Sequence, residues 1–166
     1  MKACLDVQYG AAGASVGCVL FPDWSDARPA REVCELVPVE AEGYEPGRFY
    51  RRELPCLLHV LEPLRASLEL VIVDGYVWLD AANRPGLGAH LFEALDRRVP
   101  VIGVAKSAYA GSEFAIPVLR GTSKRPLYVT AVGFEADLAA RSIRAMHGSH
   151  RLPTLLKRAD QLARER

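Results

Sequence analysis

The sequence predicts an α/β protein with a mixed β-sheet flanked by helices. Residues 2–38 form three consecutive strand-like runs, and from about residue 53 helical periodicity alternates with short apolar runs. The run Leu70-Val-Ile-Val73 is apolar on both faces and rich in β-branched residues, which is typical of a buried central strand. A meander followed by helix–strand–helix–strand therefore predicts one sheet with helices packed on it.

The first half of the chain should supply the meander and one helix. Its strands are expected at residues 2–8, 14–21 and 31–38. A glycine- and proline-containing loop follows at 40–50, and its tip, Tyr44-Glu-Pro-Gly47, has the composition of a β-turn. Helical leucine spacing starts near Glu53, with Pro55 suited to a first turn and Pro63 limiting the helix.

The second half should alternate helices and strands. Strands are expected at 70–73, 100–105, 116–119 and 127–132, and helices at 87–97, 137–146 and about 153–164. This order matches the ribonuclease H-like architecture, in which the first and fourth strands lie side by side. We expect a single domain over residues 1–166, since no repeat or linker divides the chain.

Composition excludes several classes of protein. The net charge of +1 excludes a polyelectrolyte binder, so contact with nucleic acid would need a local basic patch. No apolar run approaches the length of a membrane span, which predicts no membrane association. The cysteines Cys4, Cys18, Cys34 and Cys56 have no metal-site spacing, and we expect buried free thiols in a reducing, cytoplasmic compartment.

Two carboxylates occupy apolar strands. Asp6 lies in the first strand, and Asp74 ends the central strand directly before Gly75. Burial of a carboxylate is costly unless a cation or hydrogen bonds compensate it, so two such acids on neighbouring strands predict a shared Mg²⁺ site. Glu53 is the third candidate ligand. The alternatives are a strand-end turn or an arginine salt bridge for Asp6, and a helix-dipole partner for Glu53.

Several other residues are candidates for contact with a nucleic acid. Lys106 ends a core strand and could touch a scissile phosphate, or it could be a surface lysine. Tyr44 could stack on a base or pack on its own turn. A basic patch is expected from Arg48, Arg51, Arg52, Arg120, Lys124 and Arg125, with a solvated charged face as the alternative.

The chain resembles the endonuclease V family in several stretches that occur in family order. They are Asp6-Val-Gln-Tyr9, Tyr44 to Glu53, Val73-Asp-Gly75, Arg84 to His90, Pro100 to Ser107 with Gly111, Pro126 to Thr130, and Arg151-Leu-Pro153 through Arg158-Ala-Asp160. The resemblance covers nearly the whole chain. The stretches around Glu53, Asp74 and Lys106 are specific in combination.

The resemblance implies a ribonuclease H-like fold and a nuclease that uses Mg²⁺ or Mn²⁺. Such enzymes cut a phosphodiester near a deaminated base, chiefly hypoxanthine, in DNA or RNA. By position, Asp6, Glu53 and Asp74 are implied as metal-binding, catalytic carboxylates and Lys106 as the catalytic lysine on the phosphate. Nucleic-acid contacts are expected from Tyr44, Pro46, Gly47, Gly75, His90, Lys106, Ser107, Gly111, Arg120 and Lys124.

One departure from the family concerns the position after the last strand. The family usually has Gly-His there with an active-site histidine, whereas this chain has Gly133-Phe134. Glu135 or Asp137 could supply a fourth carboxylate instead, although Asp137 also suits an ordinary helix cap. A second departure is the bulky stretch Tyr76-Val-Trp78 after Asp74, which bears on the base pocket.

Three functions are compatible with these residues. The favoured one is a metal-dependent endonuclease V-like enzyme, expected to act as a monomer. A catalytically impaired nucleic-acid-binding homologue is the second, supported by Phe134. A ribonuclease H-like nuclease acting on structured or branched DNA is the third.

Overall fold

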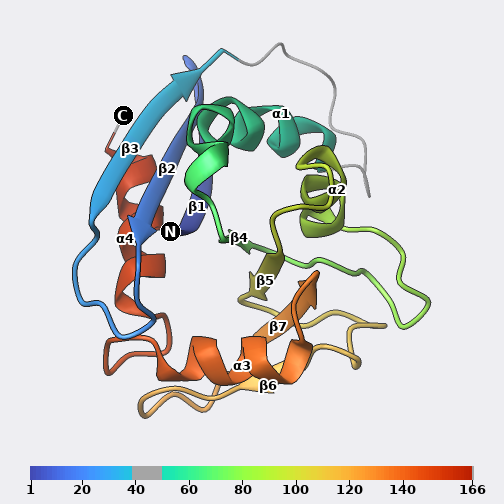
Figure 1. The fold of residues 1–166 in the computed structure, drawn as a ribbon. Helices are drawn as coiled ribbons and strands as arrows, with labels where there is room; N and C mark the ends of the chain where they lie inside the picture. The colour runs from blue at the N-terminus through green and yellow to red at the C-terminus, as the bar shows by residue number, and fades with distance from the viewer. Residues whose placement is uncertain (39–49, 166) are drawn as a thin grey trace.

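The computed structural model describes residues 1–38 and 50–165, and its elements form a seven-stranded mixed sheet with helices on both faces (Figure 1). The strands are β1 Lys2–Gly10, β2 Gly13–Phe21, β3 Arg31–Val37, β4 Leu70–Asp74, β5 Val101–Ala105, β6 Ile116–Val118 and β7 Leu127–Val132. The helices are α1 Tyr50–Leu61, the 3₁₀ helix η1 Glu62–Ser67, α2 Leu87–Ala94, α3 Ala136–Ala145 and α4 Thr154–Arg164.

The predicted fold class is confirmed. The strand order is β3-β2-β1-β4-β5-β7-β6, with β1–β4 and β4–β5 parallel and the other pairs antiparallel. The first and fourth strands are therefore neighbours, as expected from the order of the elements. Because β1, β4 and β5 are parallel, their carboxyl ends meet at one edge of the sheet, where open α/β sheets carry their ligands.

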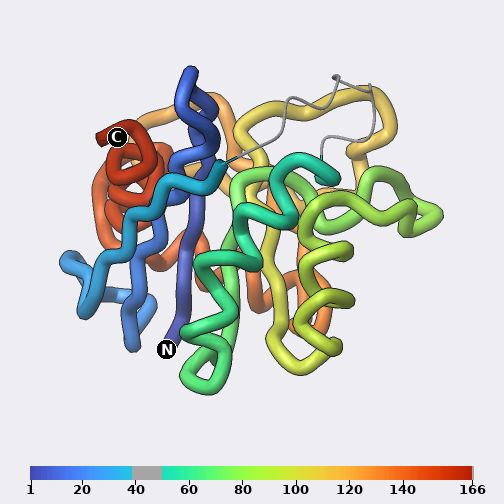
Figure 2. The backbone as a smooth tube through the Cα atoms, turned by 90° about the horizontal axis from the view of Figure 1, so that it is seen from above, coloured from blue at the N-terminus to red at the C-terminus, as the bar shows by residue number. Residues whose placement is uncertain are grey.

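The two faces of the sheet bury separate apolar cores. One core joins α1 and α2 to β1, β4 and β5 through residues such as Leu57, Leu91 and Val73. The other core joins α3 and α4 to the opposite face through residues such as Ile143 and Leu155. Figure 2 shows α1 and α2 side by side, with the red tube of α4 across the sheet from them.

Two helix boundaries differ from the sequence expectation. Within the described residues α1 begins at Tyr50, so Pro55 lies inside the helix rather than in its first turn. The helix expected at 87–97 ends at Ala94 instead. Asp96 and Arg97 adopt φ angles of 55° and 57°, in the left-handed region that cannot continue an α-helix.

The prediction of buried free thiols is confirmed for three of the four cysteines, and Cys34 is free but only partly buried. All four cysteines are free, and Cys4, Cys18 and Cys56 are buried. Burial raises the pKa of the Cys18 thiol to about 12, which keeps it protonated and unreactive. Across residues 1–38 and 50–165, none of the helices has the length and apolarity needed to cross a bilayer.

Candidate metal and nucleic-acid site

Three carboxylates from three different elements line one cavity of about 320 Å³. Asp6 comes from β1, Asp74 from the last position of β4, and Glu53 from the first turn of α1. Gln8 and Gly75 complete the polar part of the wall. The cavity therefore brings together all three of the carboxylates that the sequence singled out.

Strand register explains why Asp6 and Asp74 meet. Leu5 of β1 is the partner of Val73 of β4, and the two aspartates are the next residues along these parallel strands. Glu53 approaches the same space from the α1 face of the sheet and retains only 9% of its exposure. Strand pairing thus brings together carboxylates that the sequence marks only locally, each as an acid in an apolar strand.

Burial and mutual repulsion raise the pKa of two of these carboxylates. Burial raises the pKa of Asp6 to about 6; a hydrogen bond from Gln8 Nε2 at 3.2 Å opposes this rise, and the charge of Asp74 adds to it. Burial also raises the pKa of Glu53 to about 8, with further contributions from Asp6 and Asp74. The cluster is short of positive charge, which favours binding of a cation.

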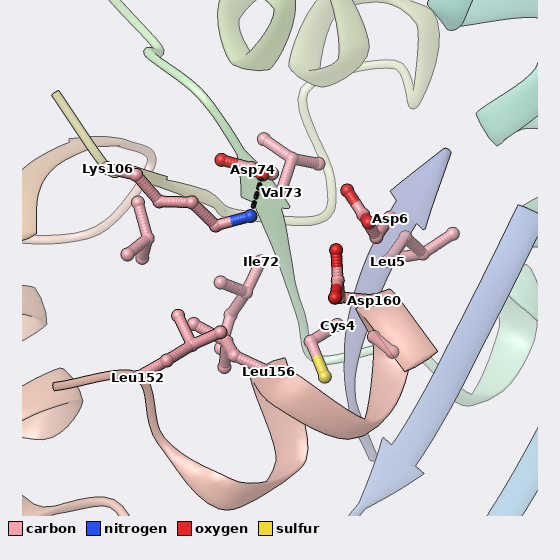
Figure 3. Close-up of a pocket in the computed structure, with 12 residues that line it drawn as sticks. Cys4, Leu5, Asp6, Ile72, Val73, Asp74, Lys106, Leu152, Leu156 and Asp160 are labelled. Atoms are coloured by element: carbon pink, nitrogen blue, oxygen red, sulfur yellow. Dashed lines mark hydrogen bonds and ion pairs between the residues drawn. The ribbon is translucent and has the colours of Figure 1, made fainter. Parts of the chain in front are cut away.

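Lys106 supplies one positive charge to this cluster. It directly follows β5, and its Nζ lies 2.6 Å from Oδ2 of Asp74 (Figure 3). Burial disfavours the charged ammonium, but the hydrogen bond and the charge of Asp74 outweigh burial and raise the pKa of Lys106. Lys106 therefore pairs with the carboxylate cluster while its side chain remains 41% exposed, and its role on a phosphate stays a prediction.

Asp160 of α4 is a further carboxylate at this site, and sequence reasoning assigned it no role. It lines a small cavity of about 20 Å³ together with Asp6, Asp74 and Lys106, and Figure 3 shows its side chain directed toward Asp6. A hydrogen bond from Arg164 lowers the pKa of Asp160. The available signal was an acid on the apolar face of the last helix, inside a stretch that carried the family resemblance.

A glycine lets α4 deliver Asp160 to the site. Gly17 of β2 is the register partner of Asp6, and a Cβ atom on Gly17 would lie 2.3 Å from the carbonyl oxygen of Ala159. Any larger residue at this position would push the helix off the sheet. The close approach places Asp160, the next residue of α4, over Asp6.

Comparison with known proteins identifies the family. The sequence model of endonuclease V matches residues 2–133. The chain belongs to the endonuclease V family. It is 32% identical to the endonuclease V of Roseiflexus castenholzii over 72% of this chain and 62% of that protein. It is 28% identical to that of Nocardia farcinica over 93% of this chain and 75% of that protein.

Solved structures of endonuclease V share the fold. The Ciona intestinalis enzyme, in complex with a DNA containing an inosine, matches with a TM-score of 0.80 and 19% identity, over 99% of this chain and 83% of that chain. The Streptomyces avermitilis endonuclease V matches with a TM-score of 0.71 and 26% identity, over 98% of this chain and 79% of that one. The chain spans about three-fifths of the lengths of the endonucleases V from Roseiflexus castenholzii and Rippkaea orientalis, at 62% and 60%.

The oxygen ligands in the cavity lined by Asp6, Glu53 and Asp74 fit a hard divalent cation. Asp6, Glu53 and Asp74 offer only carboxylate oxygens, the ligands that Mg²⁺ and Mn²⁺ prefer. In the parts of the chain that the structure describes, no three histidine, cysteine, aspartate or glutamate side chains already converge tightly enough to ligate an ion. The carboxylates share the cavity wall instead, with the Lys106 ammonium on one of them.

The prediction for Arg120 is wrong. Arg120 is only 5% exposed, so it cannot track phosphates on the surface. Its guanidinium donates to the main-chain carbonyl of Arg144 in the last turn of α3 and to carbonyls in the connection to α4, namely those of Met146, Gly148, His150 and Arg151. Arg120 therefore holds this connection together, while Lys124 of the same expected patch is exposed.

The prediction that Glu135 or Asp137 replaces the family histidine is also wrong, because both lie away from the cavity. The end of β7 pairs with the start of β5, Val132 with Val101, so residues after β7 emerge at the sheet edge opposite Lys106. Phe134 packs against the core under α3 and α4 there. Glu135 caps α3 by accepting from the Asp137 and Leu138 amides, and Asp137 is exposed in its first turn. Neither acid reaches the cavity.

The remaining candidates lie around the cavity or outside the described residues. Gly75 lines the cavity with a φ of 124°, a backbone conformation that favours glycine. Ser107 and Gly111 are exposed in the loop after β5. His90 stacks on Tyr50 with ring centroids 3.6 Å apart, which supports packing at the α1–α2 contact. The predictions for Tyr44, Pro46, Gly47 and Arg48 lie outside the described residues.

Proposed function

We propose that this protein is a metal-dependent endonuclease that hydrolyses a phosphodiester bond near a deaminated base, inosine or deoxyinosine, in nucleic acid. Residues 1–166 act as one domain, with Mg²⁺ or Mn²⁺ as the cofactor and DNA or RNA as the partner. The observation that carries the proposal is the single cavity lined by Asp6, Glu53 and Asp74. Membership of the endonuclease V family supports the substrate class.

Each residue of the cluster has a distinct task in this proposal. Asp6, Asp74 and Glu53 would hold the ion, and the raised pKa values of Asp6 and Glu53 mean that protons leave as the cation enters. When bound, the ion supplies an activated water and stabilises the leaving oxyanion. Lys106 binds a nonbridging oxygen of the scissile phosphate, and Asp160 shares the neighbouring small cavity with Lys106 and Asp6.

Gly75 and the loops beside it give the nucleic acid access to these groups. The glycine follows Asp74 directly, and a Cβ atom there would meet nothing within 4 Å, so the wall is open at this point. An open wall beside the carboxylates suits the close approach of a sugar–phosphate backbone. The exposed Ser107, Gly111 and Lys124 are proposed as further nucleic-acid contacts.

The test is cleavage of end-labelled strands that carry one deoxyinosine or one inosine, with matched strands that carry adenine. Cleavage near the lesion should require Mg²⁺ or Mn²⁺, stop with EDTA and return with added metal. Asp74→Asn keeps the shape of the side chain and removes the charge, so it should fold normally and lose cleavage. Deoxyribose and ribose strands run in parallel decide between DNA and RNA.

Two outcomes would overturn the proposal. Binding of the strands and of Mn²⁺ without any cleavage would indicate a nucleic-acid-binding homologue. Cleavage only of a lesion-free branched duplex would indicate a nuclease of the structure-selective kind. Phe134 does not favour the first of these, because its ring lies in a core away from the carboxylates.

A further inference from the structure

Arg151 stands just before α4, and within the described residues its side chain donates hydrogen bonds only to main-chain carbonyls. Its Nε donates to the carbonyl of Arg125 at 2.9 Å, and its Nη2 donates to the carbonyls of Pro126, at 2.8 Å, and Lys106. The side chain is half-buried. A charged guanidinium that contacts only neutral carbonyls gains less than one paired with a carboxylate, which points to a role in positioning.

These carbonyls lie where the β5–β7 ladder stops. The last paired residues are Ala105 and Tyr128. Beyond them the chain continues as Lys106 on one side and as Leu127, Pro126 and Arg125 on the other. Pro126 has no N–H and cannot extend the ladder. The planar guanidinium of Arg151 joins the segment after β5 to the segment before β7 at this point, in place of ladder hydrogen bonds.

We propose that Arg151 is the positioning residue for Lys106, and through Lys106 for the phosphate-binding step of the proposed function, on which this inference rests. Holding the Lys106 carbonyl fixes the backbone from which its side chain reaches Asp74 at 2.6 Å. The same arginine lies three residues before α4, the helix that brings Asp160 to the site. Arg151 therefore sets the relative position of Lys106 and Asp160.

Arg120 provides a matched control in the same chain. It too is an arginine whose guanidinium donates to main-chain carbonyls, and it too supports the connection to α4. Within the described residues it donates no hydrogen bond to Lys106, and its one link to Arg151 is a long contact of 3.5 Å to the main-chain carbonyl of that residue, not to its guanidinium. A purely structural role for Arg151 predicts that Arg151→Gln and Arg120→Gln behave alike, whereas a positioning role predicts that only Arg151→Gln changes Lys106.

The first measurement follows the mobility of the Lys106 side chain by NMR and does not depend on cleavage. The chain has only the lysines Lys2, Lys106, Lys124 and Lys157, so a protein labelled with ¹³C at the lysine ε-carbons gives a simple NMR spectrum, in which Lys106→Arg assigns the signal of interest. The ion pair with Asp74 should immobilise Lys106 and give two resolved ε-proton shifts. Arg151→Gln should merge them, and Arg120→Gln should leave them resolved.

The second measurement is steady-state cleavage, corrected for the folded fraction by circular dichroism. Arg151→Gln should lower kcat about tenfold with KM within about twofold, because a misplaced group costs the reacting geometry more than binding. Arg120→Gln should lower the melting temperature and keep kcat. Arg151→Lys and Arg120→Lys serve if either glutamine variant fails to fold.

The two proposals fail separately. Resolved Lys106 ε-proton shifts in every folded Arg151 variant, or equal effects of the Arg151 and Arg120 variants on kcat, would overturn the positioning role. If the wild-type protein cleaves no strand, the proposed function fails while the NMR comparison still decides whether Arg151 places Lys106.

Discussion

The ammonium of Lys106 lies 2.6 Å from a carboxylate oxygen of Asp74, the residue that ends the central strand. This contact joins the ends of two neighbouring parallel strands, because Asp74 pairs with Val104, two residues before Lys106. Lys106 is the counter-charge on Asp74, while the charge of Arg52 lowers the pKa of Glu53. The same carboxylate is a proposed metal ligand, so the lysine and the metal compete for Asp74.

Replacement of Lys106 by methionine should therefore separate metal binding from catalysis. In Lys106→Met the competing cation is gone, and Mn²⁺ affinity measured by calorimetry should rise, by roughly tenfold or about 1.4 kcal/mol. Cleavage should fall by about 100-fold or more, because the developing charge on the phosphate loses its lysine. Lys157→Met removes the same charge from an exposed position of α4 and should change neither quantity. Weaker Mn²⁺ binding in Lys106→Met would contradict competition.

The stability of the metal-free protein should fall as the pH rises through neutrality. Burial raises the pKa of Glu53 from 4.5 to about 8 in the folded state. Between about pH 4.5 and 8 the folded state then binds more protons than the unfolded state. The contribution of Glu53 to the free energy of unfolding is therefore fully present below about pH 4.5 and is lost as the pH rises through about 8. Melting temperatures recorded in EDTA across this range should show the decline.

Glu53→Gln should flatten that profile, because the amide does not ionise. Glu62→Gln changes an exposed glutamate at the start of η1 and should keep the wild-type slope. A slope that is unchanged in Glu53→Gln would show that another group carries the pH dependence, with Asp6, whose pKa burial raises to about 6, as the next to replace.

Removal of the hydroxyl group should have opposite effects on the free energy of unfolding at Tyr9 and at Tyr76. The Tyr9 hydroxyl is buried and has no hydrogen-bond partner within the described residues, whereas the Tyr76 hydroxyl donates to the Ser107 carbonyl at 2.9 Å. Tyr9→Phe should raise the free energy of unfolding by about 1 kcal/mol, and Tyr76→Phe should lower it by about 1 kcal/mol. Urea denaturation measures both, and destabilisation by Tyr9→Phe would indicate a partner that the structure does not contain.

The carboxylate cluster could be predicted from sequence because its signals are local. An acid that ends an apolar strand, as at Asp74, can be recognised without knowing the fold, and the order of the elements made Asp6 its neighbour. Glu53 followed from its place at the start of a helix and from the family resemblance. The seven strands and the principal helices were predicted for the same reason: hydrophobic periodicity is a property of short segments.

The errors concern residues whose roles depend on distant parts of the chain. In the sequence Arg120 resembles a surface arginine, because the carbonyls of the α3–α4 connection that bind its guanidinium lie more than 20 residues away along the chain. The position of Phe134 depends on β7 running antiparallel to β5, which sends the following residues to the far edge of the sheet. Asp160 reaches the site only because α4 packs closely on β2, a contact that no sequence window contains.

That close contact gives a direct test of how Asp160 is placed. A Cβ atom on Gly17 would lie 2.3 Å from the Ala159 carbonyl oxygen and 2.7 Å from the Ala163 amide nitrogen. Gly17→Ala should therefore shift α4 outward and destabilise the protein by about 1–3 kcal/mol, as overpacking of a close contact does. Displacement of Asp160 from Asp6 should also lower cleavage about tenfold in the fraction that remains folded.

Gly10→Ala is the matched control, since a Cβ atom on Gly10 would meet nothing within 4 Å. It makes the same chemical change at the end of the neighbouring strand β1 and should leave both the denaturation midpoint and the cleavage rate near the wild-type values. Equal stability of the Gly17→Ala and Gly10→Ala proteins would mean that α4 tolerates the added methyl group. The tight seat of α4 on β2 would then not be what holds Asp160 beside Asp6.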